Sequence, residues 1–532
     1  MKKYCIRKIC KNGKEMLAFD MPYKNLYQTL EATAKRLAGK TGIIDEQRSV
    51  TFGELLEETD ALAAYLKYSV GIERGDRVGI LMVNSIAFCT AFYALMKLGA
   101  TAIPMSTKLQ QGELFYRIAD CQMQYLFCDV EWYNKVRGIL QQTPIKSVIA
   151  YGNNTPLDCL CYTRGVEEGK NLAPTDCMQE DDLPALVMYT SGTTGKPKGA
   201  VMTQFNLLQG MYAYAAMEMS ENDRTVLAVP AFHITGLNCV MTVFVLLGGL
   251  QVMVPYFDAR EVLDRMTEYR ITHFHAVSTV YIKLTEAFDA QKNDLTSLHS
   301  ALCGGGFIAQ ENIRRFCKIA PNVEFHPVYG MTETSGAGTY FPGHCLESNK
   351  LDSAGVCVPN CEMRIDRERE GDGEICFRGA FVIDHYFHED QNENITVDGW
   401  LRSGDIGDFD EDGYLYIKDR LKDMINRGGE KVFSYEVESV IVTYPGINEA
   451  IAFGVDDPVY GEVPAAVYVA GPEAEIDEQA LIEDLRNKLA HYKVPVYLER
   501  RNQLPMTVNG KIRKSVLRKE FREKYINRLG EL

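Results

Sequence analysis

One stretch of the chain, residues 189–199, concentrates glycine, hydroxyl and lysine residues in the order YTSGTTGKPKG. Its glycines leave the backbone free to fold around an anion, its serine and threonines supply hydroxyl donors, and Lys196 and Lys198 supply positive charge. A polyphosphate is held by such a set of groups. The apolar run 183–188 before it predicts a buried strand that leads into the loop. A flexible surface loop has a similar composition, so the stretch indicates a phosphate site only if other nucleotide-binding groups accompany it.

A second group of residues could bind the rest of a nucleotide. In YGMTET, the ring of Tyr329 can stack on a base, Gly330 permits close approach to a phosphate, and Glu333 can hold a divalent cation. Three consecutive glycines at 304–306 let the backbone lie flat against a planar ring. Each of these features also occurs in ordinary turns, and none is decisive alone.

Three charged residues further along could complete such a site. Asp405, in SGD, could accept hydrogen bonds from the two hydroxyls of a ribose, and Arg420, in DRLKD, could reach a ribose or a phosphate. Asn509-Gly510 is a strong two-residue hairpin signal that places Lys511 directly after a tight turn. From there a lysine can reach into another domain's cleft. The ordinary alternatives are a turn aspartate, a surface arginine and one more basic residue near the C-terminus.

The composition is that of an ordinary globular protein and excludes some partners. Of the 532 residues, 46% are apolar and 24% are charged, which is typical of a soluble chain. The formal net charge of −15 argues against nucleic acid as a main partner. An anionic ligand therefore needs a local cluster of positive groups.

The cysteines and the apolar runs predict a compartment. The fifteen cysteines are an odd number, and their nearest approaches to a metal pattern, Cys159-x-Cys161 and Cys357-x₃-Cys361, have no partner ligands at zinc-site spacing. We expect reduced thiols, no zinc and no haem. The first ten residues have no apolar core or cleavage site of a signal peptide, and the longest apolar run, 239–255, is too short and interrupted to span a bilayer. These features predict a cytoplasmic protein without a transmembrane segment.

Strand and helix signals alternate along the first 350 residues. We expect strands at 76–82, 101–104, 126–128, 147–151, 225–229, 251–254 and 273–275, with helices between them and a capping box, TFGE at 51–54, opening an early helix. This alternation predicts a large domain of layered α/β subdomains with largely parallel sheets. Short strands such as 374–379 and 413–417 predict a small β-rich module after it. A boundary near 418–423 leaves about 110 residues for a small α+β C-terminal domain.

Six motifs follow one another along nearly the whole chain: YTSGTTGKPKG at 189–199, PAFHITGLN at 230–238, YGMTET at 329–334, SGD at 403–405, DRLKD at 419–423 and NGKIRK at 509–514. In these motifs and their order the sequence resembles the superfamily of adenylate-forming enzymes: acyl- and aryl-CoA synthetases, the adenylation domains of peptide synthetases, and firefly luciferase. The resemblance implies a two-step reaction that requires ATP, Mg²⁺ and CoA. A carboxylate attacks the α-phosphate of MgATP to give an acyl-adenylate and pyrophosphate, and the thiol of CoA then displaces AMP to leave a thioester.

The resemblance also implies which residues bind the nucleotide. The phosphate loop corresponds to Thr190, Ser191, Gly192, Thr193, Thr194, Gly195, Lys196, Pro197 and Lys198. The adenine and α-phosphate site corresponds to Gly304, Gly305, Gly306, Tyr329, Gly330, Met331, Thr332 and Thr334, with Tyr329 stacked on adenine and Thr332 on the α-phosphate. Glu333 matches the magnesium ligand, and Asp405 and Arg420 match the ribose-binding pair.

The family uses its small C-terminal domain twice, by rotating it between the two steps. The resemblance implies a large domain over 1–419, a mobile domain over 420–532 and a hinge at Lys422. Lys511 matches the catalytic lysine that bridges the substrate carboxylate and the phosphate during adenylation. After rotation, Gly428, Gly429 and Glu430 should help to form the channel for the pantetheine arm of CoA.

The acid pocket of the family lies between three of these segments. In this chain it is predicted to include His233, Ile234, Asn238, Met241, Phe307 and Gly336, with His233 as the gate toward the ATP site. These segments supply apolar or small residues, and no obvious positive residue accompanies them to pair with a second carboxylate; the apolar or small residues are Ile234, Cys239, Met241, Phe307, Gly336 and Ala337. The preferred substrate is therefore an apolar acid, either a fatty acid of medium or longer chain or an aromatic acid.

The sequence leaves alternatives open for the acceptor of the acyl group and for the oligomeric state. The stretch NRGGEKVFSYEVE at 426–438 is most similar to carboxylate–CoA ligases. A stand-alone enzyme that loads a carrier protein, an acyl-adenylate ligase without thiol transfer, and a non-catalytic nucleotide-binding protein are the alternatives. The last conflicts with the loop itself, because GTTGK falls short of GxxxxGK[ST] and would leave Lys511 unexplained. A homodimer is left open.

Overall fold

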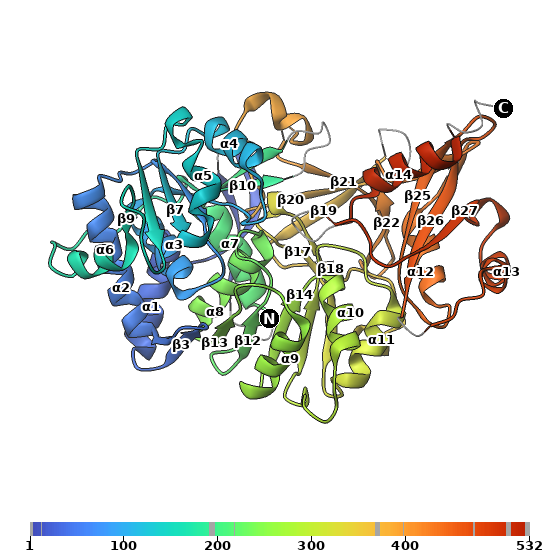
Figure 1. Cartoon of the computed structure of the whole chain (residues 1–532), viewed down its shortest axis with the longest axis horizontal. Coiled ribbons are helices and arrows are strands. Elements are labelled where there is room, and N and C mark those ends of the chain that lie inside the picture. Colours follow the sequence, from blue (N-terminus) through green and yellow to red (C-terminus); the bar gives the residue numbers. More distant parts are fainter. Residues whose placement is uncertain are drawn as a thin grey trace.

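The computed structural model describes residues 4–11, 13–190, 197–217, 219–367, 373–396, 398–471, 474–506 and 512–526. A large domain, blue to orange in Figure 1, lies beside a small C-terminal domain in red, and both combine helices with sheets. The predicted fold class is confirmed. Among the helices of the described ranges, none is both long and apolar enough to cross a bilayer.

The first sheet of the large domain carries the strand that leads into the phosphate loop. Its order is β11-β10-β6-β5-β7-β8-β9, with every pair parallel except β10 and β11. The strands are β5 (Arg77–Leu81), β6 (Thr101–Pro104), β7 (Tyr125–Asp129), β8 (Ser147–Tyr151), β9 (Leu160–Cys161), β10 (Pro184–Thr190) and β11 (Lys198–Thr203). The helices of this part are α1 (Leu26–Leu37), α2 (Phe52–Tyr65), α3 (Ile86–Leu98), α4 (Gln111–Asp120), α5 (Tyr133–Arg137) and α6 (Tyr162–Gly169). The predicted capping box opens α2, since Thr51 and Glu54 bond each other's backbone.

The large domain contains two further sheets. One has the order β12-β13-β3-β4 and the other β14-β15-β16-β17-β18. Their strands are β3 (Thr41–Ile44), β4 (Ser49–Thr51), β12 (Arg224–Leu227), β13 (Leu250–Met253), β14 (His273–Ala276), β15 (Ser300–Cys303), β16 (Glu324–Gly330), β17 (Gly338–Tyr340) and β18 (Val356–Cys357). The helices are α7 (Gln204–Ala215), a π-helix η4 (Thr235–Met241), α8 (Thr242–Leu247), α9 (Ala259–Glu268), α10 (Ser278–Ala287) and α11 (Gln310–Ile319).

The β-rich module and the C-terminal domain end the chain. The module is the antiparallel sheet β19 (Cys361–Asp366), β20 (Glu374–Gly379), β21 (Leu401–Phe409) and β22 (Leu415–Arg420); a separate hairpin, β1 (Ile6–Lys11) and β2 (Lys14–Phe19), lies at the N-terminus. The C-terminal sheet is β23 (Ile425–Arg427), β24 (Glu430–Val432), β25 (Ile447–Asp457), β26 (Gly461–Ala470) and β27 (Tyr497–Arg501), with helices α12 (Ser434–Val442), α13 (Glu478–Lys488) and α14 (Lys514–Phe521). The predicted strand 413–417 begins two residues later than expected, because Gly413 has a φ of +81° and closes a turn.

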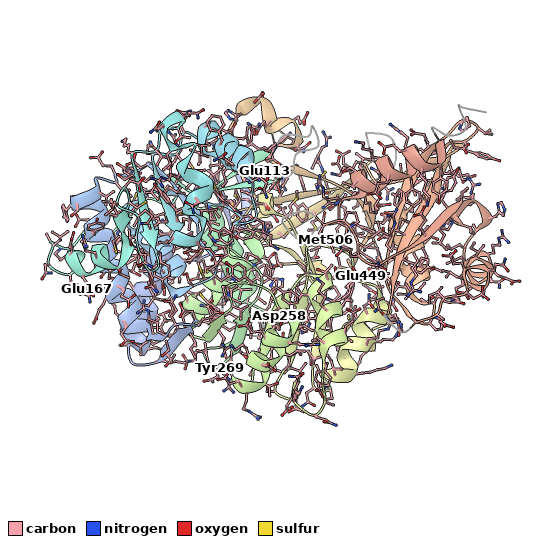
Figure 2. All side chains as sticks on the ribbon, in the orientation of Figure 1. Glu113, Glu167, Asp258, Tyr269, Glu449 and Met506 are labelled. Carbon is pink, nitrogen blue, oxygen red and sulfur yellow. The ribbon has the colours of Figure 1, made fainter. Side chains whose placement is uncertain are left out.

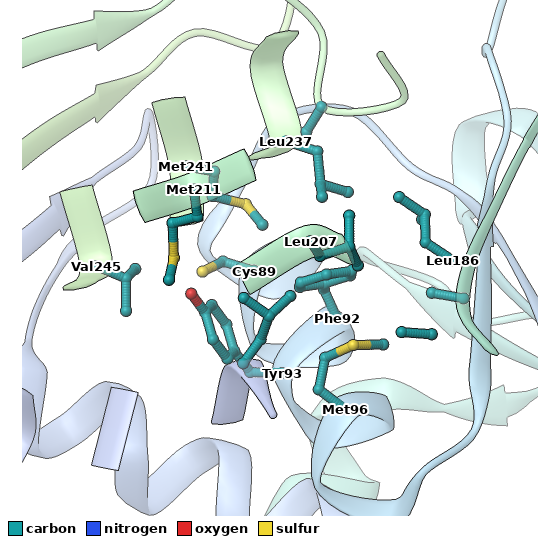
Figure 3. Packing of buried hydrophobic residues seen from close by; sticks show 14 of the residues in the cluster. Cys89, Phe92, Tyr93, Met96, Leu186, Leu207, Met211, Leu237, Met241 and Val245 are labelled. Carbon is teal, nitrogen blue, oxygen red and sulfur yellow. The ribbon is translucent and has the colours of Figure 1, made fainter. Parts of the chain in front are cut away.

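The main core lies where α3 meets the helices that follow the phosphate loop. Phe92 and Tyr93 of α3 are fully buried and lie beside Leu207 and Met211 of α7 (Figure 3). Met241, at the end of η4, belongs to the same cluster (Figure 3). Both strands that flank the loop, β10 and β11, and the helix α7 that follows them contribute side chains to this core.

An ion pair joins the loops before two strands. His299 precedes β15 and Asp223 precedes β12, and His299 Nε2 lies 3.1 Å from Asp223 Oδ1. Burial raises the pKa of Asp223, but hydrogen bonds from His299, Thr272 and Ser220 outweigh it and hold the pKa below its ordinary value. The hydrogen bond to Asp223 raises the pKa of His299, although burial opposes the shift.

We expect this pair to stabilise the fold less as the pH rises. A histidine whose pKa is raised by folding contributes fully below its unfolded pKa of about 6.5, and its contribution is lost as the pH rises through the folded pKa. His299→Gln should therefore lower the melting temperature more at about pH 6 than at about pH 8.5. Differential scanning fluorimetry of both proteins measures this, and an equal difference at the two pH values would contradict the ion pair.

Candidate active site

The phosphate loop is the connection of the β10–β11 hairpin. Thr190 ends β10 and Lys198 begins β11, and the two residues are paired in the register. The predicted contacts Ser191, Gly192, Thr193, Thr194, Gly195 and Lys196 lie outside the described residues. The carbonyl of Pro197 accepts a hydrogen bond from Tyr116 (3.2 Å), and Lys198 Nζ lies 3.0 Å from Glu393 Oε1. Neighbouring segments therefore hold the C-terminal side of this loop.

Glu333 lies directly beside the hairpin. It belongs to the short 3₁₀ helix η5 (Thr332–Thr334) and is only 6% exposed. Its Oε1 accepts hydrogen bonds from the hydroxyl of Thr190 (3.2 Å) and from that of Tyr386 (3.0 Å). The fold thus brings together the first and third motifs, which are far apart in the sequence.

The rest of the YGMTET motif is locally ordered. Thr334 is fully buried, and its hydroxyl bonds to the backbone of Met331. Thr332 is half-buried beside Glu333. A Cβ at Gly330 would lie 2.3 Å from the carbonyl oxygen of Gly336, so only glycine permits this approach of the two segments.

Three predicted nucleotide residues meet at the edge of the β-rich module. The Tyr329 hydroxyl donates to Asp405 Oδ2 (2.7 Å), and Arg420 Nε lies 3.4 Å from Asp405 Oδ1. Asp405 and Arg420 are also paired across β21 and β22, so strand register fixes their proximity. Burial raises the pKa of Tyr329, which keeps its hydroxyl a donor. The arrangement presents an aromatic ring, a carboxylate and a guanidinium together.

The three glycines after β15 approach the same strand. A Cβ at Gly304 would lie 2.8 Å from the side chain of Val328, which directly precedes Tyr329. Gly305 has a φ of +77°, and both Gly305 and Gly306 are exposed. The backbone of Gly305 and Gly306 is therefore accessible to a ligand, and Gly304 lies against the strand that carries Tyr329.

The predicted acid-pocket segments also meet. Gly336, with a φ of +90°, lies so close to Cys239 that a Cβ would be 2.3 Å from its Sγ, and Ile234 and Tyr214 are next to it. The Tyr214 hydroxyl donates to the carbonyl of Gly336 (3.0 Å). His233 packs its ring against Phe232 with centroids 4.7 Å apart. The residues 233–239 and those after Thr334 thus form one apolar wall.

Three residues predicted in that pocket have other contacts in the structure. Asn238 is fully buried and its side-chain amide donates to the carbonyls of Leu207 (3.1 Å) and Ser335 (3.0 Å). Met241 packs in the main core (Figure 3). Phe307 stacks on Tyr435 of the C-terminal domain, with centroids 5.2 Å apart and planes 11° apart. Their assignment to the pocket stays a prediction.

The C-terminal domain meets the large domain through α12 and the start of β25. Besides the Phe307–Tyr435 stack, Arg315 Nη1 donates to the carbonyl of Ile447 (3.0 Å) and to Asn448 Oδ1 (3.2 Å). Burial and the nearby carboxylate of Glu286 raise the pKa of Glu449, which Figure 2 labels at the side of this domain that faces the large one.

The residues predicted to move lie on exposed parts of this domain. Lys422 is exposed, and its carbonyl accepts a hydrogen bond from Arg518 (3.3 Å). Gly428, Gly429 and Glu430 form an exposed turn between β23 and β24. Lys511 lies outside the described residues, but a β-bridge joins Met506 to Ile512 on either side of it. Lys514 anchors this motif to α12, with Nζ 2.9 Å from Glu438 Oε1.

A magnesium ion would find one protein carboxylate here. No cluster of three His, Cys, Asp or Glu side chains that could hold a metal occurs among the described residues. Glu333 Oε1 accepts two hydroxyls, whereas the described residues give its Oε2 no hydrogen bond. Mg²⁺ keeps several waters and is commonly bound by one or two carboxylates together with substrate phosphates. Glu333 fits that pattern.

Two models of known protein families match this chain. The model of the AMP-binding enzyme family matches residues 30–387, and the model of the AMP-binding enzyme C-terminal domain matches residues 436–511. The chain belongs to the AMP-binding enzyme family. The adenylate-forming resemblance is thereby confirmed, and the AMP-binding enzyme described here is an acid–thiol ligase of the AMP-forming class.

Similar proteins include ligases for fatty and aromatic acids. The chain is 32% identical over 462 residues to the long-chain-fatty-acid–CoA ligase FadD13 of Mycobacterium tuberculosis, covering 85% of this chain and 90% of that protein. It is 31% identical over 508 residues to a feruloyl-CoA synthase of Amycolatopsis, covering 94% and 98%. Among solved structures, the anthranilate CoA ligase AuaEII in complex with anthranoyl-AMP superposes with a TM-score of 0.87 at 25% identity, covering 95% and 99%.

Two contacts at this site have no signal in the sequence. Tyr386 bonds Glu333, and Tyr435 stacks on Phe307, yet each tyrosine lies outside the six motifs. Tyr435 belongs to the stretch 426–438, which resembles that of CoA ligases, but nothing in that stretch indicates its contact with Phe307. A tyrosine in an apolar stretch such as 381–387 is ordinary core, so no local pattern marks it. Only the three-dimensional arrangement identifies these residues.

We expect Asp405→Asn to weaken ATP binding by about 10- to 100-fold, because the substitution removes the charge that pairs with Arg420 and would hold a ribose. Isothermal titration with ATP measures the effect. Asp408→Asn is the matched control: it lies on the same strand but pairs with Arg367 and Lys418 at the surface, so ATP affinity should change little. Equal losses in the two variants would contradict a nucleotide role for Asp405.

Proposed function

We propose that this enzyme joins an apolar carboxylic acid to CoA in two steps, through an acyl-adenylate. The observation that carries the proposal is the convergence of Thr190 on Glu333 in one place and of Tyr329, Asp405 and Arg420 in another. The first group is suited to a metal-bound polyphosphate and the second to adenine and ribose. Together they orient an ATP molecule with its α-phosphate near Thr332.

The first step brings an anionic carboxylate to an anionic phosphate, so fixed positive groups and donors are required where charge accumulates. In our proposal the phosphate loop, residues 190–198, binds the leaving pyrophosphate, and Lys511 bridges the acid and the α-phosphate. Mg²⁺, held at Glu333, would neutralise charge on the phosphate oxygens. Tyr329 with Gly304–Gly306 holds the base, and Asp405 with Arg420 holds the ribose, so the AMP portion stays in place while pyrophosphate leaves.

The second step needs a different face of the C-terminal domain. We propose that the part of the C-terminal domain that follows Lys422 rotates about this residue, which withdraws Lys511 and brings Gly428, Gly429 and Glu430 to the entrance for the CoA thiol. The exposure of that turn and of Lys422 supports a rotation in which neither has to break a packed contact. The interface through Phe307 and Tyr435 would separate during this motion.

The acid is proposed to be a fatty acid or an aromatic acid. The wall formed by Ile234, Cys239 and Gly336 is apolar and favours a hydrocarbon or ring over a second charge. The similar fatty-acid and feruloyl ligases support this choice. All fifteen cysteines are unpaired in the structure, which supports a reducing compartment such as the cytoplasm. A homodimer stays a prediction.

We expect a screen of carboxylic acids to give pyrophosphate release with apolar acids and AMP formation that depends on CoA. Pyrophosphate release separates an adenylating enzyme from a mere nucleotide-binding protein. Replacing CoA by a pantetheine-loaded carrier protein then distinguishes the two acceptors. Activity confined to dicarboxylates or amino acids would refute the proposed substrate class.

We expect Lys511→Ala to slow adenylation by about 10²- to 10³-fold, because a fixed donor to the transition state is removed. Thioester formation from a supplied acyl-adenylate should be largely spared. Stopped-flow measurement of each half-reaction tests this, with Lys514→Ala in the same motif as a variant that removes the contacts of Nζ with Glu438 and Ser434. An equal loss in both half-reactions would count against domain alternation.

A further inference from the structure

The two oxygens of the Glu333 carboxylate have different surroundings. Oε1 accepts two hydroxyl hydrogen bonds, from Thr190 at 3.2 Å and from Tyr386 at 3.0 Å. Oε2 has no hydrogen bond from the described residues. A carboxylate held on one oxygen by two donors cannot rotate freely about its last bond, so its second oxygen has one preferred direction.

Tyr386 is held as firmly as the carboxylate it contacts. It is 3% exposed, its backbone N–H donates to Asn392 Oδ1 (2.7 Å), and it forms a β-bridge with Ala200 of β11. Three residues earlier in the chain, the backbone N–H of Ile383 donates to the backbone carbonyl of Glu333 (2.9 Å). The same short segment therefore holds both the backbone and the side chain of Glu333.

This segment also reaches the phosphate hairpin. The N–H of Phe387 donates to the carbonyl of Gly199 (2.8 Å), one residue after Lys198. Lys198 Nζ lies 5.6 Å from the centre of the Tyr386 ring, and its ion-pair partner, Glu393, follows shortly after in the chain. Residues 383–393 thus connect the end of the phosphate loop to Glu333, although they contain none of the six motifs.

We propose that Tyr386 is a positioning residue that orients Glu333, so that Oε2 faces the metal bound to the nucleotide phosphates; the inference rests on the proposed role of Glu333. The hydroxyl of Tyr386 is fixed in place by its rigid, buried ring. It donates a hydrogen bond to Oε1 and so leaves Oε2 as the oxygen that can bind a metal.

The inference predicts a defect in metal binding with nucleotide binding retained. Tyr386→Phe keeps the buried ring and removes only the donor to Glu333. We expect Mn²⁺ affinity, measured by electron paramagnetic resonance with a non-hydrolysable ATP analogue present, to fall by about 10-fold, the effect typical of one hydrogen bond to a charged group. Affinity for the analogue without metal should be unchanged, and a high Mg²⁺ concentration should restore the adenylation rate.

Two further variants separate this inference from the proposed function. Glu333→Gln should lose Mn²⁺ binding more severely than Tyr386→Phe. Tyr281→Phe is the matched control, because it removes another buried tyrosine hydroxyl. That hydroxyl donates to the carbonyls of Phe274 and Leu302 and not to Glu333. Its Mn²⁺ affinity should equal that of the unmodified enzyme.

Each outcome has one meaning. Unchanged Mn²⁺ affinity in Tyr386→Phe, with a loss in Glu333→Gln, would overturn the positioning role and leave the proposed function intact. Unchanged affinity in Glu333→Gln would overturn both. If Tyr386→Phe does not fold, as judged by its melting temperature, Asn392→Ala replaces it, because that variant releases the Tyr386 backbone without altering either side chain at the carboxylate. Unchanged Mn²⁺ affinity in Asn392→Ala would likewise overturn the inference.

Discussion

The proposed active site depends on placing a nearly buried carboxylate, that of Glu333, beside the loop that we propose to bind a polyphosphate. Glu333 is 6% exposed, and burying a charge is costly unless hydrogen bonds or opposite charges replace the lost water. The net charge of −15 means that the protein as a whole does not offset this cost. Local donors do so instead: the hydroxyls of Thr190 and Tyr386 bond one oxygen of the carboxylate. Segments from three parts of the chain therefore have to meet around a single side chain.

The proposed nucleotide site is divided between a part fixed within the large domain and a part that would move with the C-terminal domain. Tyr329, Asp405 and Arg420 are fixed by strand pairing and burial within the large domain and its β-rich module. The C-terminal domain instead meets the large domain through the stack of Phe307 on Tyr435, the packing of Ala309 against its core, and polar contacts around Asn448. Glu449 and Glu286, two carboxylates, face each other across this contact. Polar contacts of this kind are typical of interfaces between domains that move relative to each other.

Some buried histidines and cysteines have no part in the proposed reaction. His273 and His275 are buried on β14, and burial lowers the pKa of each to about 3, so both are neutral packing residues. Burial likewise raises the pKa of Cys239 to about 12, and its sulfur lies against Gly336 in the proposed acid pocket. A thiol in this state is a small apolar surface, which agrees with an apolar acid as its neighbour.

The sequence by itself determined the family, the order of the motifs and the alternation of strands and helices, because short-range chemistry encodes them. The loop composition of 189–199, the capping box at Thr51 and the Asp405 and Arg420 motifs can each be read within a few residues. Only the tertiary structure decided that Phe307 stacks on Tyr435 and that Tyr386 bonds Glu333. Both contacts join residues more than 50 positions apart, and an isolated tyrosine carries no pattern that distinguishes a core residue from a donor to a carboxylate. Such pairings arise from sheet register and packing over the whole fold, which no local stretch of sequence contains.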